Sequence, residues 1–144
     1  MSANLDLVRS ILEPWERGDF SSVVWAHPDH EYEIVGGPTP GKWKGLAAMR
    51  EAWATILNAW EDWRTIADVY EEVDERRVIV FTHSTARGRT SGMAIPPAWT
   101  RGAVLFEIAE GKVVRHVVYL DGRERAIAEV GRMQEADAED SRHR

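Results

Sequence analysis

The chain has 144 residues with 44% hydrophobic content, which suits one folded domain with its own core. Its net charge of −6 argues against nucleic acid or an anionic membrane as the main partner. It has no cysteine, which excludes disulfides, thiolate nucleophiles and cysteine-ligated metals. The first residues lack the basic and apolar regions of a signal peptide, and no apolar run approaches ~18 residues, so we expect a cytoplasmic protein.

The first third of the chain predicts helices and one strand. Apolar residues recur at helical spacing from Leu5 to Trp15, with Pro14 and Gly18 as signals for the helix end. Asp19 is a suitable cap for a short second helix over 20–26, which the breaker His27-Pro28-Asp29 would close. The pattern then predicts a strand over 31–35, a Gly/Pro loop over 36–41 and an amphipathic helix over 45–60.

The remainder reads mainly as β-structure. Strands are predicted over 63–73 and 77–87, then a hairpin of 99–109 with 112–120 across Glu110-Gly111. A closing helix is expected over 123–130, and residues 133–144 are polar without an apolar face. We therefore expect one domain over 1–132 and a disordered tail over 133–144. Helices followed by an antiparallel meander predict an α+β fold whose bent sheet leaves a cavity.

The strand over 112–120 is the clearest in the chain, because it combines four valines with a Gly turn before it and Asp-Gly after it. Both faces are largely apolar, which indicates a central strand. His116 shares one face with Val118, since side chains alternate along a strand. Asp121, the most conspicuous acid, is better read as the cap of the closing helix, with Glu124 three residues later.

Three short motifs together resemble a known family. These are Gly18-Asp19 after the first helix, Trp43-Lys44-Gly45 before the long helix, and Gly111 to Arg115 before a final Tyr-Leu-Asp. Ala94-Ile95-Pro96-Pro97 is similar to a segment of the family's polyketide cyclases. Over about residues 5–132 the chain resembles the SnoaL-like branch of the nuclear-transport-factor-2-like superfamily.

That resemblance implies a cone-shaped fold, in which a curved antiparallel sheet wraps around three N-terminal helices and leaves a deep pocket. It also implies a homodimer formed through the sheet. Members of the superfamily include ketosteroid isomerases, polyketide cyclases, limonene-epoxide hydrolases, dehydratases and domains that only bind ligands. Because one fold hosts many functions, the residues must be compared one by one.

The family's polar catalytic positions match apolar residues here. The pocket acid of the last strand matches Val118, and the acid of the preceding strand matches Val104. The isomerase base matches about Ile34, and its oxyanion-hole tyrosine falls near Ile11. Each general acid or base contributes roughly 10²–10⁴ in rate, and valine and isoleucine can act as neither. The usual reactions should not run here by the usual routes.

The candidate catalytic residue is His116, whose ordinary pKa near ~6.5 suits acid–base work, although a hydrogen-bonded core histidine fits the same pattern. Trp53 and Trp25 match tyrosines that flank the isomerase pocket, and the aromatic residues could equally be plain core. His83 lies mid-strand, on a face whose direction the sequence leaves open. We expect the ligand-binding residues to be Trp15, Trp25, Tyr32, Ile34, Trp53, His83, Trp99, Val104, Val118 and Leu120.

We expect no metal and no cofactor. The segment from His27 to Glu31 matches no zinc spacing and reads as a polar turn, and the sequence has no nucleotide fingerprint or serine-hydrolase elbow. The favoured hypothesis is a small protein that binds an apolar or aromatic molecule without catalysis. The alternative is a cofactor-free isomerase, cyclase or lyase that acts through His116 on a polyketide- or steroid-like ring. A sheet-mediated interaction module is a third option.

Overall fold

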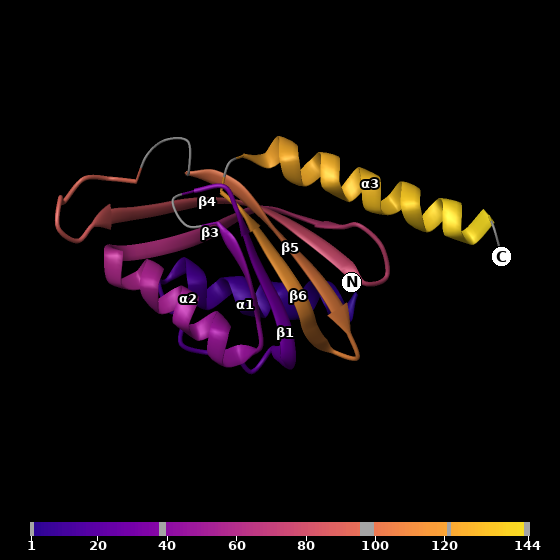
Figure 1. Ribbon diagram of the computed structural model, residues 1–144, viewed down its shortest axis with the longest axis horizontal. Coiled ribbons are helices and arrows are strands. Elements are labelled where there is room, and N and C mark those ends of the chain that lie inside the picture. Colours follow the sequence, from indigo (N-terminus) through magenta and orange to yellow (C-terminus); the bar gives the residue numbers. More distant parts are fainter. Residues whose placement is uncertain (1, 38–39, 96–99, 121, 143–144) are drawn as a thin grey trace.

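The computed structural model describes residues 2–37, 40–95, 100–120 and 122–142 and shows an α+β fold (Figure 1). The helices are α1 (Ala3–Glu16), α2 (Leu46–Ala59) and α3 (Arg123–Arg142). The strands are β1 (Ala26–Val35), β2 (Gly41–Lys44), β3 (Trp60–Glu72), β4 (Arg77–Gly88), β5 (Arg101–Ala109) and β6 (Lys112–Tyr119). They form a curved, unclosed sheet in the order β2-β1-β6-β5-β4-β3.

The sheet is mixed, so the prediction of a purely antiparallel sheet is wrong in one pairing. Strand β1 runs parallel to β6, with Tyr32 opposite His116 and Ile34 opposite Val118. The other pairings are antiparallel, including the predicted hairpin of β5 and β6. A parallel partner far along the chain leaves no turn motif in the sequence, which explains the miss.

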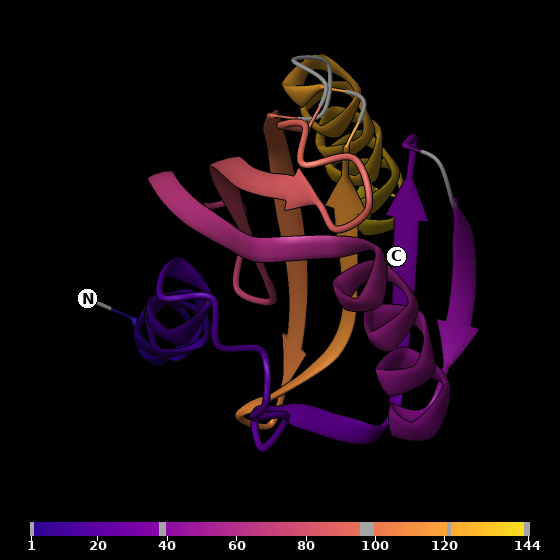
Figure 2. The ribbon, with the colours of Figure 1, turned by 90° about the vertical axis from the view of Figure 1, so that its left-hand side faces the viewer.

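Helices cover the two faces of the sheet separately. Figure 1 shows α1 and α2 on one side of the sheet and α3 on the other side. In the view of Figure 2, α3 again lies at the top, above α1 and α2. We call the face toward α1 and α2 the inner face, where the larger apolar core lies, and the face toward α3 the outer face. Ser2 caps the start of helix α1, since its side chain accepts a hydrogen bond from the Leu5 amide.

The predicted second helix over 20–26 does not form, so two helices rather than three precede the main run of strands. The Asp19 carboxylate instead accepts hydrogen bonds from the backbone N–H and the hydroxyl of Ser21, which makes a local turn. Strand β1 also begins earlier than predicted and contains Pro28. This proline is tolerated because the β1–β6 register is irregular between Ala26 and Glu31.

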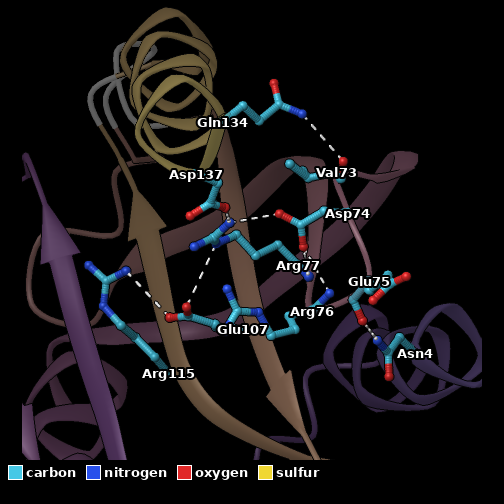
Figure 3. Close-up of polar contacts among 10 residues, drawn as sticks. All are labelled: Asn4, Val73, Asp74, Glu75, Arg76, Arg77, Glu107, Arg115, Gln134 and Asp137. Atoms are coloured by element: carbon cyan, nitrogen blue, oxygen red, sulfur yellow. Dashed lines mark hydrogen bonds and ion pairs between the residues drawn. The ribbon is translucent and has the colours of Figure 1, made fainter. Parts of the chain in front are cut away.

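Helix α3 is longer than predicted and continues to Arg142 instead of ending near Val130. The expected tail from residue 133 is therefore helical over most of its length. Arg77 of β4 reaches Asp137 at 2.9 Å, and the Gln134 side chain donates to the Val73 carbonyl at 3.3 Å (Figure 3). These contacts connect the second half of α3 to β4 and to Val73, and Ala126, Val130 and Met133 of α3 pack on the outer face of the sheet. A domain boundary at residue 132 stays a prediction.

Among the described residues, no helix combines the length and the apolar character needed to cross a membrane. A cytoplasmic location stays a prediction.

Candidate ligand cavity

A cavity of about 530 Å³ lies on the inner face of the sheet, between the strands and α1 and α2. Its volume falls within the range typical of small-molecule sites. Eight residues predicted from the sequence contribute to its wall: Trp15, Tyr32, Ile34, Trp53, Val104, His116, Val118 and Leu120. Strand alternation brings five of them together, because Tyr32 and Ile34 of β1, Val104 of β5, and His116 and Val118 of β6 lie on the same face of adjacent strands. Trp15 and Trp53 are contributed by α1 and α2.

Two predicted residues, Trp25 and His83, lie outside the wall of this cavity. Trp25 lines a separate hollow of about 420 Å³ below α1, although its ring touches His116. His83 lies outside the cavity wall, where its Nδ1 is 2.7 Å from an Asp68 carboxylate oxygen. Burial raises the pKa of Asp68, but hydrogen bonds from His83 and Arg123 outweigh it and hold that pKa below its ordinary value. Trp99 lies outside the described residues.

His116 is fully buried and surrounded by rings. It is stacked between Tyr32, at 4.5 Å between ring centroids, and Phe106, at 5.8 Å. Three tryptophans complete the surround at 5.6–6.3 Å: Trp15, Trp25 and Trp53. Aromatic pairs at such distances are stabilising beyond the area that they bury. The imidazole therefore sits in an apolar shell, fixed from both faces.

His30 is the important residue that sequence reasoning missed. It is fully buried on β1, and its Nε2 lies 2.5 Å from Nδ1 of His116. Its own Nδ1 lies 3.0 Å from the carbonyl oxygen of Val113. The segment from His27 to Glu31 was read as a turn, yet His30 continues the alternation of Tyr32 and Ile34. That period-2 pattern could have placed it on the inner face.

The burial of both histidines disfavours their charged forms. Burial lowers the pKa of His30, and hydrogen bonding to the Val113 carbonyl opposes this effect only in part. Burial, with a smaller effect from His30, holds the pKa of His116 well below its ordinary value. Both rings are therefore neutral at pH 7. Nε2 of His116 is buried and has no hydrogen-bond partner among the described residues.

Another part of the cavity wall is more polar. Here Trp63 Nε1 donates to the Thr65 hydroxyl at 3.2 Å, and this hydroxyl lies 3.3 Å from that of Ser84. Arg89 also lines the cavity, and its guanidinium donates to carbonyl oxygens at the end of α2, including Leu57 at 3.0 Å. The sequence did not predict Thr65 and Ser84, because single hydroxyls in strands carry no sequence signal. Within the described ranges, no three histidine or acidic side chains are close enough to hold a metal ion.

The SnoaL-like domain family matches residues 8–116, which is more than half of the chain. The chain belongs to the SnoaL-like family. No curated protein matches it in sequence.

Solved structures of SnoaL-like and nuclear-transport-factor-2-like proteins share the fold. TerC, co-crystallised with polyporic acid, has 20% identity and a TM-score of 0.70, over 90% of this chain and 98% of TerC. A nuclear-transport-factor-2-like protein of unknown function from Burkholderia pseudomallei has 18% identity and a TM-score of 0.70, over 84% and 92%. A SnoaL-like protein from Jannaschia sp. CCS1, proposed to be a polyketide cyclase, has 14% identity and a TM-score of 0.63, over 81% and 83%.

In this SnoaL-like chain, Ile34, Val104 and Val118 all line the cavity. They are the residues that were matched to acidic positions of the family's enzymes, and this match stays a prediction. Phe106 lies directly opposite His116 on β5, and Val104 lies opposite Val118. On the inner face of β5 and β6, His116 is therefore the one side chain with an ordinary pKa near neutrality.

Proposed function

We propose that the chain binds an apolar or aromatic small molecule in the cavity on the inner face. The observation that carries this proposal is the lining: aromatic and aliphatic side chains form most of the wall around about 530 Å³, and the polar side chains among them include His116, Arg89 and several hydroxyls. Sites for small ligands combine mostly apolar walls with a few placed polar groups. The co-crystal of TerC with polyporic acid shows that a protein of this fold was studied with a ring compound.

Equilibrium dialysis with naphthalene tests the binding. Val118 lines the cavity, so Val118→Phe places extra volume where the ligand would sit. Val69 is 51% exposed on β3 and lines neither hollow, so Val69→Phe is the matched control. We expect wild type and Val69→Phe to retain naphthalene equally, and Val118→Phe to bind at least tenfold more weakly. Failure of wild type to retain any naphthalene, or equal binding by all three proteins, would overturn the proposal.

A second candidate function is proton transfer by His116, as in a cofactor-free isomerase, cyclase or lyase. The observation that favours it is the Nε2 atom without a hydrogen-bond partner, on a ring that forms part of the cavity wall. Such a nitrogen can take the proton from carbon next to a carbonyl group, which leaves an enolate and an imidazolium, and can then return the proton. The depressed pKa of His116 makes it a weak base, which suits acidic carbon substrates.

The exchange of the carbon-bound hydrogens of 2-tetralone in D₂O, followed by proton NMR, tests this candidate. Wild type should accelerate exchange above the buffer rate, and His116→Gln should lower that acceleration by roughly 10²–10⁴. His83→Gln is the control, since His83 lies outside the cavity and should leave the rate unchanged. Equal rates in wild type and His116→Gln would remove the catalytic role.

We further propose that two copies associate through the outer face of the sheet. Support comes from a strip of alternating charge, in which Arg115 lies 3.2 Å from Glu33 and 3.9 Å from Glu107. Alternating charges can complement a second copy turned by a two-fold axis. Sedimentation equilibrium should give a dimer that Arg115→Glu weakens; a monomer in wild type would contradict this arrangement.

A further inference from the structure

We infer that His30 is a positioning residue that holds His116 in one tautomer, so that the cavity presents a hydrogen-bond acceptor at His116 and selects ring ligands that carry an acidic O–H there. This inference rests on the proposed function for the ligand, whereas the tautomer itself can be measured without any ligand.

The backbone carbonyl of Val113 determines which nitrogen of His30 is protonated. A carbonyl oxygen can only accept a hydrogen bond, and it lies 3.0 Å from Nδ1 of His30. Nδ1 of His30 therefore carries a proton. The neutral ring has one proton only, so Nε2 of His30 carries a lone pair.

The contact between the two imidazole rings determines which nitrogen of His116 is protonated. Nε2 of His30 lies 2.5 Å from Nδ1 of His116, and two lone pairs at that distance would repel each other. Nδ1 of His116 must therefore donate its proton to His30. Since His116 is also neutral, its Nε2 is left with a lone pair and no proton. The backbone of β6 thus determines, through His30, which nitrogen of His116 can accept a proton.

The lone pair on Nε2 of His116 lies in a buried, aromatic environment. Nε2 of His116 is buried without a hydrogen-bond partner among the described residues, and the carbocyclic rings and indoles packed around the imidazole belong to Tyr32, Phe106 and three tryptophans. Burial raises the pKa of Tyr32, which keeps its phenol neutral. A buried acceptor without a donor is unfavourable, so a hydrogen bond from a ligand O–H to this nitrogen contributes more to the binding free energy than the same bond at an exposed site. A phenol or an enol supplies that donor together with a flat apolar body.

The covering rings define how a ligand would reach this atom. Nε2 is itself covered although the His116 ring contributes to the cavity wall, so an O–H reaches it after a local rotation of a neighbouring side chain. Such rotations are small compared with opening the fold. The ligand then replaces a ring–nitrogen contact by a hydrogen bond.

Nitrogen-15 NMR of the histidine rings tests the tautomer directly. In wild type we expect His116 to show a protonated Nδ1 and an unprotonated Nε2 as one dominant form. His30→Phe removes the acceptor and should move the proton of His116 to Nε2 or produce a mixture. His27→Gln is the control, because His27 is partly exposed and its Nδ1 accepts a hydrogen bond from the neighbouring Asp29 amide and not from either buried imidazole. A wild-type His116 that carries its proton on Nε2 overturns the inference.

Equilibrium dialysis with 2-naphthol and 2-methoxynaphthalene tests the selectivity. The two compounds share the ring system, but only 2-naphthol has an O–H. Wild type and His27→Gln should prefer 2-naphthol at least tenfold, and His30→Phe and His116→Phe should lose that preference while retaining 2-methoxynaphthalene. Equal binding of the two compounds by wild type overturns the inference but leaves the proposed function standing. Binding of neither compound overturns the proposed function, and the NMR result then decides the role of His30 alone.

Discussion

The imidazole of His116 stacks on the phenol ring of Tyr32, with 4.5 Å between ring centroids and 26° between ring planes. The two residues are directly opposite on the parallel strands β6 and β1. His30 approaches the same imidazole from β1. A neutral polar pair is therefore built into an aromatic core, and this arrangement has consequences for stability and binding.

The first consequence is a pH dependence of stability. The pKa values of His30 and His116 are lowered in the folded state, chiefly by burial. Above pH ~6.5 both histidines are neutral whether the chain is folded or not, so they do not make the free energy of unfolding depend on pH. As the pH falls below ~6.5, the unfolded state takes up protons first, and the free energy of unfolding should fall by up to about 1.4 kcal/mol per pH unit for each histidine.

Urea unfolding between pH 7.5 and 5 measures this effect. The charged or titratable groups that act on the pair are Glu31, which favours the charged form of His30, and His27, which opposes it. Asp68 and Asp74 have lowered pKa values in the folded state. Their contribution to the free energy of unfolding is therefore lost only near and below about pH 4, outside this window. His116→Gln should reduce the slope by about half. A free energy of unfolding that is constant or rises between pH 6.5 and 5 would contradict the neutral pair.

A second prediction concerns Gly102, on β5 beside the cavity. A Cβ atom at this position would overlap the carbonyl oxygen of Tyr119, a backbone atom that cannot move alone. Gly102→Ala should therefore lower the free energy of unfolding by about 1–3 kcal/mol. Gly131 on α3 has open space around it, so Gly131→Ala should be neutral or slightly stabilising. Thermal unfolding of the two variants compares them, and equal melting temperatures would refute the steric argument.

The third prediction concerns Arg77, which joins β4 to α3. Its guanidinium lies 2.7 Å from Asp74 and 2.9 Å from Asp137, and its side chain is 10% exposed (Figure 3). Arg77→Met should lower the free energy of unfolding by about 1–3 kcal/mol, because Asp74 and Asp137 lose their charged hydrogen bonds from the guanidinium. The exposed pair of Arg17 with Glu13 is the control, and Arg17→Met should change stability by less than about 1 kcal/mol.

The same variant tests the length of α3. Arg77→Met removes the contact to Asp137, so amide exchange should become faster in the second half of α3 while its first turns stay protected. Hydrogen exchange measured by NMR separates the two halves. Unchanged exchange after residue 133 would show that the ion pair does not hold the helix.

The local patterns in the sequence predicted most elements and the inner-facing residues of β6. Alternation alone placed His116 with Val118, because a strand has a strict period of two residues. The same rule predicted Tyr32 and Ile34 on one face of β1. It stopped short of His30 because Pro28 indicated a break, whereas the structure accommodates Pro28 where the register with β6 is irregular.

The remaining differences depend on contacts between distant segments. The parallel pairing of β1 with β6 joins residues more than 80 positions apart, and no turn motif announces it. The pair of His30 and His116 exists only through that pairing. The second half of α3 contacts Arg77 through Asp137, which is 60 positions away along the chain. Sequence patterns describe local preference, and these features arise from tertiary structure.

Methyl NMR during a titration with 2-naphthol is the most direct test of the central claim, that the cavity on the inner face binds a ring compound. Val104 and Val118 line the cavity, whereas Leu105 and Val117 are buried on the outer face of the same two strands. We predict saturable shifts of the Val104 and Val118 methyl signals, with those of Leu105 and Val117 nearly unchanged. Val104 and Val118 signals that stay in place at saturating ligand, or larger shifts at Leu105 and Val117, would contradict the account.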